Sequence, residues 1–216
     1  MANKDHSLDS KIIDAALEEF STYGFQRASL HKIASNANVT TGALYTRYKN
    51  KNDLFSSLVN VIFENFKPYT EKLTSMYMNA HNNKDVDGFI DALKYEWNLY
   101  FNVLYDNKKE AILLLCKSDG SEAKEFFKKM MCYKETNTVE FFEQFAKDKS
   151  ERENNSEILE NFDIDRHAIV MLMNMQFSLF DGVLQLNLSK EKSLKCMDTM
   201  GEFITLGWKN LFEKYL

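Results

Sequence analysis

Apolar side chains recur every three or four residues along most of the chain, which is the spacing of one face of an α-helix. The first such stripe holds Ile12, Ala16 and Phe20. Later stripes predict long helices over these ranges: 86–105, 108–117, 121–147, 163–188 and 190–215. With the elements that precede them, the pattern predicts an all-α fold of about nine helices.

The first 50 residues differ from the rest because short helical segments alternate with turn residues. Gly24 follows the first stripe, and glycine favours the left-handed backbone that ends a helix. Ser29 is a candidate N-cap of a second helix, and Asn38, which tolerates a positive φ, makes the next turn. Thr40 then caps a third short helix. These residues are predicted to form a three-helix head.

Beyond the head, residue types indicate where the longer helices begin and end. Asn50 and Asp53 resemble a capping box that opens a fourth helix, which continues to a point between residues 68 and 77. The Asn-rich segment 74–87 is predicted to be a loop. The charged, Asn-rich segment 147–161 is predicted to be an exposed connector.

Composition supports the helical prediction and excludes other classes. Seven Gly and one Pro are too few for a collagen-like or Pro/Gly-rich disordered chain, and for the many turns of a sandwich or barrel. At 44% hydrophobic residues the chain can fill a sizeable core.

The net charge of −5 taken alone argues against a nucleic-acid partner, but the charge is unevenly spread. Residues 1–51 carry seven basic and five acidic side chains, and the remainder carries twenty and twenty-seven. Four of the seven bases lie between Lys32 and Lys51, a stretch without any acid. The sequence therefore predicts a basic head on an acidic body.

Nothing in the chain predicts catalysis, a metal or a cofactor. It has no phosphate loop, nucleophile elbow or His-Glu-x-x-His motif, and its three cysteines (Cys116, Cys132 and Cys196) have no metal-ligand spacing. His167 is expected to pair with Asp163. The N-terminus lacks a signal-peptide core, and the longest uncharged apolar stretch is shorter than the roughly 18 residues of a membrane span. A soluble cytoplasmic protein with no membrane partner is expected.

Two helices joined by a sharp turn form the helix-turn-helix pattern, whose second helix enters the DNA major groove with its N-terminus first. Leu30, Ile33, Ala34, Val39 and Leu44 supply the apolar inner face. Small residues are needed where the second helix begins, and Thr40, Thr41 and Gly42 meet this need.

With these spacings, the stretch from Ile12 to Leu58 resembles the DNA-binding domain of TetR-family transcriptional repressors. The matching positions are Ile12-Ile13-Asp14-Ala15-Ala16, Phe20, Gly24-Phe25, Ser29-Leu30, Ile33-Ala34, Val39-Thr40-Thr41-Gly42-Ala43-Leu44-Tyr45, Tyr48, Lys51 and Leu54. Three positions depart from the family pattern: Asn38 replaces Gly, Tyr48 replaces Phe, and Thr46 stands where His is frequent.

The resemblance implies roles for individual residues. The candidates for contact with bases are Thr40, Thr41, Gly42 and Tyr45, with Thr46 leaving open which bases are read. The candidates for contact with phosphates are Ser29, Tyr48 and Lys51, and Arg47 and Lys49 would add unspecific charge. Tyr45 has an alternative role, core packing against Leu30.

The last two helices are apolar on more than one side, so they must be buried on more than one side. The resemblance implies a twofold four-helix interface, formed by Met173, Phe177, Phe180, Leu184, Gly201, Ile204, Trp208 and Leu211. The alternative is a pair of helices central to a monomer.

Aromatic and Met side chains in the middle helices are core residues or the lining of an apolar effector pocket. The candidates for the pocket are Phe63, Phe66, Trp97, Tyr100, Phe101, Met130 and Met131. Glu96 is expected to be a solvated surface residue, with contact to a cationic effector as the alternative.

The sequence thus predicts a DNA-binding domain at residues 1–50 and an effector-binding and dimerisation domain at residues 51–216. The predicted function is a homodimeric regulator, a repressor by resemblance, that binds a near-palindromic operator of double-stranded DNA and is released by a small hydrophobic effector. The alternatives are a helical small-molecule carrier or enzyme without an operator, and an architectural DNA protein without an effector.

Overall fold

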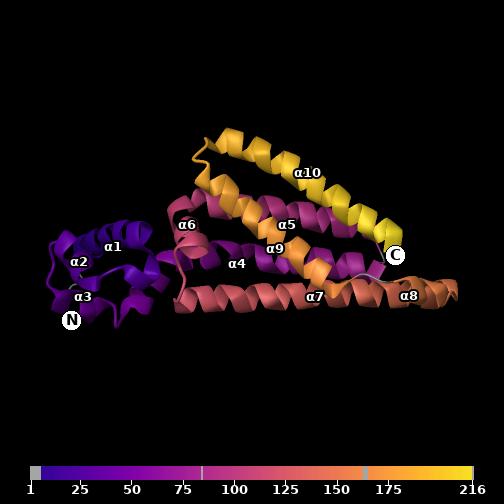
Figure 1. Cartoon of the computed structure of the whole chain (residues 1–216), viewed down its shortest axis with the longest axis horizontal. Helices are drawn as coiled ribbons and strands as arrows, with labels where there is room; N and C mark the ends of the chain where they lie inside the picture. The colour runs from indigo at the N-terminus through magenta and orange to yellow at the C-terminus, as the bar shows by residue number, and fades with distance from the viewer. Residues whose placement is uncertain (1–5, 84, 163–164, 216) are drawn as a thin grey trace. The chain divides into compact units, whose positions relative to one another are not determined.

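The computed structural model describes residues 6–83, 85–162 and 165–215, and all regular secondary structure within these ranges is helical. This confirms the all-α prediction, with ten helices in the described residues in place of about nine (Figure 1). The helices are α1 (His6–Arg27), α2 (Leu30–Asn36), α3 (Thr41–Arg47), α4 (Lys51–Asn83), α5 (Val86–Asp106), α6 (Lys108–Cys116), α7 (Glu122–Glu153), α8 (Glu157–Asn161), α9 (Arg166–Gln185) and α10 (Lys190–Tyr215).

The chain folds into two compact units. Unit 1 comprises Met1–Asn65 and Leu104–Lys129, and unit 2 comprises Phe66–Val103 and Met130–Leu216. α4 and α7 each begin in unit 1 and continue into unit 2. The assignment of residues 1–50 to DNA binding and of residues 51–216 to effector binding is a division by function, and it stays a prediction.

The core of unit 1 is built by the apolar faces that the sequence pattern indicates. Ile12, Phe20, Ile33, Leu44 and Phe55 are each completely buried. The ring centroids of Phe20 and Phe55 lie 5.0 Å apart in an edge-to-face arrangement. Five side chains from four helices are therefore buried in the core of unit 1.

The core of unit 2 is aromatic. Phe142 and Phe212 stack with their ring centroids 4.5 Å apart, and Phe89 and Phe141 stack at 4.4 Å. Phe89 also meets Phe212 edge to face at 4.9 Å. These rings join α5, α7 and α10 into one packed body.

Two predicted connectors are helical instead. The predicted loop at 74–87 is wrong because α4 continues to Asn83, where Tyr77 and Ala80 turn inward and Ala80 is buried. The predicted connector at 147–161 is partly helical, since α7 runs to Glu153 and α8 follows. In both segments helix packing overrides the turn preference of Asn. Residues 163 and 164 lie outside the described residues.

Candidate functional site

The turn between α2 and α3 has the predicted backbone. Asn38 has a φ of 55°, in the left-handed region, and its N–H donates to the carbonyl of Ser35 at 3.1 Å. Thr40 is the N-cap of α3, and its hydroxyl oxygen accepts the N–H of Ala43 at 3.1 Å. Gly24 in α1 also has the expected positive φ, 71°.

α3 is held firmly against the head. Its inward residue Leu44 is completely buried. Arg47 at its C-terminal end donates from Nε to Asp9 Oδ1 at 2.5 Å, which joins α3 to α1. Arg47 also reaches the carbonyl of Ala43 at 3.4 Å. Its guanidinium thus stabilises the head, a role that the sequence does not reveal.

α3 leaves its outer face open. Gly42, Tyr45 and Thr46 are exposed, and Thr41 is half-buried. Tyr45 is 49% exposed, which favours contact outside the chain over core packing against Leu30. The Thr46 hydroxyl donates to the Gly42 carbonyl at 2.9 Å, so its own proton is already used within the helix.

One side chain beside α3 is absent from the sequence predictions. His31 of α2 lies with Nδ1 3.3 Å from the hydroxyl of Thr41. Ten residues separate the two, and no periodicity links them. The imidazole adds a polar group to the outer surface next to the predicted base-contacting residues.

The predicted phosphate contacts are also structural. Ser29 caps α2 through its hydroxyl, and its N–H donates to the buried Glu19 carboxylate at 3.0 Å. Lys51 donates to the carbonyl of Gln26 at 2.9 Å, and partial burial lowers the pKa of its ammonium. Tyr48 is half-buried at the C-cap of α3, where burial raises its pKa.

The structure does not gather the seven predicted effector residues around one cavity. Phe101 and Met131 are buried core residues. Phe63 packs edge to face on Phe126 at 5.1 Å within unit 1. Phe66 does the same on Tyr100 at 5.1 Å within unit 2, and Met130 is partly exposed.

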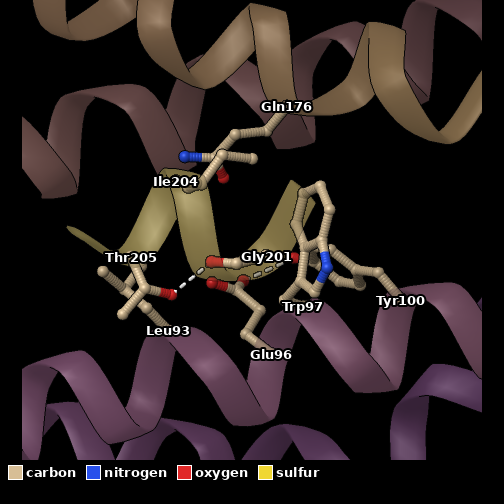
Figure 2. Close-up of a pocket in the computed structure, with 8 residues that line it drawn as sticks. All are labelled: Leu93, Glu96, Trp97, Tyr100, Gln176, Gly201, Ile204 and Thr205. Atoms are coloured by element: carbon tan, nitrogen blue, oxygen red, sulfur yellow. Dashed lines mark hydrogen bonds between the residues drawn. The ribbon is translucent and has the colours of Figure 1, made fainter. Parts of the chain in front are cut away.

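Tyr100 and Trp97 line a small pocket of about 10 Å³ (Figure 2). The Trp97 indole donates to the carbonyl of Met197 at 2.9 Å, and a Cβ added to Gly201 would lie 2.7 Å from the indole nitrogen. The close backbone approach predicted at Gly201 is therefore made to Trp97 of the same chain.

A far larger cavity, of about 820 Å³, lies in unit 2. Its wall is formed by residues of α4, α5, α7, α9 and α10. The apolar lining residues are Leu73, Met78, Phe89, Leu93, Phe141, Met173 and Trp208. None of the seven predicted effector residues lines this cavity.

A buried polar cluster forms part of the wall of this cavity. Glu96 is only 5% exposed and accepts hydrogen bonds from the hydroxyls of Tyr77 at 2.6 Å and Tyr100 at 2.7 Å. The Lys134 ammonium pairs with the same carboxylate. The prediction of a solvated Glu96 is wrong, because its three partners come from positions along the sequence that its local pattern does not reveal.

The cluster fixes the charge states of its members. Burial alone would raise the pKa of Glu96, but Lys134 and the hydrogen bonds from Lys134, Tyr77 and Tyr100 outweigh it, and the pKa is lowered. Burial and the Glu96 charge raise the pKa of both tyrosines well above 10.0. Glu96 is thus an anion with neutral phenol donors and one cation around it.

The predicted dimer residues mostly serve the chain's own core. Five of the eight are buried within the chain: Met173, Phe180, Leu184, Ile204 and Trp208. The other three, Phe177, Gly201 and Leu211, are half-buried. A side chain already buried in one chain has little surface left for a partner, and the predicted dimer interface stays a prediction.

α9 and α10 expose a different apolar stripe. Met171, Met175 and Leu186 of α9 are exposed, as are Phe203 and Leu206 of α10. Phe203 is 73% and Met171 71% exposed. Large apolar side chains so far from the core are typical of a surface that another molecule covers.

Two further features bear on the predicted absences. Among the residues that the structure describes, no group of three or more His, Cys, Asp or Glu side chains could hold a metal ion. By length and composition alone α9 could cross a membrane, with 28% of its most apolar stretch buried. Core helices of globular proteins have the same character, so this is a weak indication. His167 lies 3.0 Å from Asp165, and its predicted partner Asp163 is outside the described residues.

Comparison with known proteins finds relatives for the N-terminal head of the chain. Residues 12–58 match the family model of bacterial regulatory proteins of the tetR family. The HTH-type transcriptional regulator AcrR of Shigella flexneri is 49% identical over 47 residues, which are 22% of each chain. The uncharacterised HTH-type transcriptional regulator YhgD of Bacillus subtilis is 29% identical over 79 residues. That match covers 36% of this chain and 41% of YhgD, so the chain spans less than half the length of these relatives.

The similarity in fold extends further than the similarity in sequence. A Clostridium perfringens protein named as a fatty acid metabolism regulator matches 91% of this chain and 97% of its own, with a TM-score of 0.52 and 26% identity. The matched residues 12–58 include α2, α3 and the turn between them. These residues of the chain are therefore similar to the DNA-binding segment of bacterial regulatory proteins of the tetR family.

Proposed function

We propose that this protein is a homodimeric transcriptional regulator that binds a near-palindromic DNA operator in the cytoplasm, acts as a repressor, and is released by a small hydrophobic effector. The observation that carries the proposal is the outer face of α3, where Gly42 and Tyr45 are exposed while Leu44 and Arg47 fix the helix to the head.

The charge around α3 suits a polyanion. Arg27, Lys32 and Lys49 are exposed, and the chain from residue 28 to residue 51 contains no acid. Contacts to the DNA backbone phosphates supply most of the affinity, and contacts between side chains of a recognition helix such as α3 and the edges of the nucleobases supply sequence choice. This head contains both exposed basic side chains and the exposed face of α3.

A dimer follows from the need to read two half-sites. A twofold axis presents two recognition helices to half-sites about one helical turn of DNA apart or a little more. We infer that the exposed stripe of α9 and α10, with Met171 and Phe203 at its most exposed points, forms the contact between protomers. This burial would also give the apolar surface of α9 a partner other than lipid.

The cavity of unit 2 is the candidate effector site. Its volume of about 820 Å³ lies within the usual range of small-molecule sites, and its wall combines seven apolar side chains with a larger number of polar and charged ones. An effector that binds one conformation of the dimer more tightly than the DNA-bound one lowers the DNA affinity by linkage.

Selection of bound fragments from a random DNA pool tests the proposal. We expect a two-half-site sequence whose binding weakens steeply as salt rises, and Tyr45→Ala should weaken that sequence more than random DNA. Lys49→Ala is the matched control, because it should weaken both alike. Binding that is independent of salt, or a pool without enrichment, would contradict the proposal and favour a helical small-molecule carrier or enzyme.

A further inference from the structure

The polar cluster around Glu96 defines what kind of molecule suits the cavity. We propose that the cavity of unit 2 binds an uncharged, mostly apolar molecule that carries a carbonyl-type oxygen, and that this oxygen accepts a hydrogen bond from the Lys134 ammonium. The inference rests on the proposed ligand-responsive function and adds the chemical class of the effector.

Lys134 has a donor to offer. Its ammonium carries three N–H groups. One is given to Glu96, and the hydroxyl of Tyr100 lies 3.4 Å away as a second, weaker acceptor. The ring faces of Tyr100 and Phe177, at 4.8 and 5.8 Å, accept no conventional hydrogen bond. Lys134 lines the cavity and its side chain is 22% exposed, so one donor remains for a ligand there.

Glu96 has little to offer a cation. Its Oε1 accepts from Lys134 and Tyr100, and its Oε2 accepts from Tyr77. A cationic ligand would have to displace Lys134 from this carboxylate or lie beside the Lys134 charge in a poorly solvated place. In both arrangements the unfavourable electrostatic free energy exceeds the gain from the new contact with Glu96.

An anionic ligand meets the converse difficulty. Glu96 already neutralises Lys134 at hydrogen-bond distance, so a second carboxylate would add an uncompensated negative charge. The other charges of the wall do not change this balance: Glu143 pairs with Arg166 at 3.4 Å, and Glu140 is matched by one lysine, Lys147. Apart from His81, the charged side chains of the wall and the paired Arg166 carry no excess charge.

The rest of the wall suits an apolar body. Most of its accessible surface is apolar, and Phe89, Phe141 and Trp208 present ring systems. Burial of such a body supplies most of the affinity, while one hydrogen bond to a charged donor supplies orientation.

Four test compounds of matched size separate the possible classes: benzophenone, diphenylmethane, diphenylacetate and benzhydrylammonium. Isothermal titration calorimetry on the full chain should give benzophenone the tightest binding, about tenfold tighter than diphenylmethane, which lacks the acceptor. Diphenylacetate and benzhydrylammonium should both bind more weakly than benzophenone. Tighter binding of either ion would overturn the inference.

Lys134→Met should reduce the affinity for benzophenone about tenfold and leave diphenylmethane unchanged. Lys129→Met, exposed on the same helix but outside the cavity wall, is the matched control and should change neither affinity. Lys134→Met leaves the buried Glu96 carboxylate without its cationic partner and can therefore unfold the protein. The double variant Glu96→Gln with Lys134→Met removes both charges and should show the same loss.

Equal affinity for benzophenone and diphenylmethane in the unsubstituted protein would overturn the inference without any variant. Operator binding without a test compound separates this result from the proposed function. If the protein binds an operator but binds benzophenone independently of Lys134, the proposed ligand class is wrong and the proposed regulatory function stands. If the protein binds benzophenone through Lys134 but binds no operator, the proposed regulatory function is wrong and the proposed ligand class stands.

Discussion

Gly42 offers a test in which stability and DNA binding move in opposite directions. It is the second residue of α3 and exposed, and a Cβ added there would meet only the hydroxyl oxygen of Thr40, at 3.9 Å. The fold of the head therefore has no steric need for glycine at this position. Replacement by alanine reduces the backbone entropy of the unfolded chain, and we expect Gly42→Ala to raise the free energy of unfolding by about 0.5 kcal/mol.

The same methyl group stands on the face proposed to enter the DNA groove. A close approach of the α3 backbone to base edges leaves no space for it, and a disrupted base contact costs about 1–3 kcal/mol. We therefore expect Gly42→Ala to bind the selected operator about tenfold or more weakly. Fluorescence anisotropy with labelled operator measures this loss, and urea unfolding followed by circular dichroism measures the gain in stability.

Asn60→Ala is the control, because Asn60 is exposed on α4 and also gains helix propensity on replacement. It should stabilise the protein without weakening operator binding. The reasoning is refuted if Gly42→Ala binds the operator as tightly as the unsubstituted protein, or if it lowers the free energy of unfolding by more than about 1 kcal/mol, since the space around Gly42 excludes such a clash.

Three further outcomes follow from unit 2. Gly201→Ala should lower the free energy of unfolding by about 1–3 kcal/mol, because the added methyl group overlaps Trp97. Gly207→Ala has open space at its Cβ and should leave the free energy of unfolding unchanged or raise it by up to about 1 kcal/mol. Equal changes for the two variants in urea unfolding would contradict this. Above pH 10 the unfolded chain releases phenol protons that folded Tyr77 and Tyr100 retain, so the free energy of unfolding should fall by up to about 1.4 kcal/mol per pH unit for each, and substitution by Phe should flatten the slope. Met171→Lys should convert dimers to monomers in light scattering, and an unchanged mass would exclude α9 from the interface.

The local features of the head could be predicted from its sequence because they depend on single residues. Asn38 has a positive φ and Thr40 is an N-cap, and both features follow from the known preferences of these two residue types. The failure at 74–87 has the opposite cause. Asn and His there favour a turn, but the burial of Ala80 and the bond from Tyr77 to Glu96 hold the segment in α4.

The candidate ligand site was beyond the sequence for a related reason. Glu96 meets Tyr77 across 19 positions and Lys134 across 38, and no periodicity pairs such distant residues. The two stripes of α9 posed a different difficulty. Both are apolar, so the sequence shows that two faces are buried but does not show which face belongs to the chain's own core, and the structure assigns that face to residues such as Phe180.

The uneven use of the basic side chains predicts the salt dependence of DNA binding. Arg47 and Lys51 are tied within the head, which leaves Arg27, Lys32 and Lys49 as the exposed basic residues between positions 27 and 51. A dimer that uses only these three per head neutralises about six phosphates, and log K should fall with log salt with a slope of about −5. If Arg47 and Lys51 were released to the phosphates, ten contacts would give about −9. A titration of operator affinity against salt therefore measures how many basic side chains of each head contact phosphates, and a slope near −9 would show that Arg47 and Lys51 are among them.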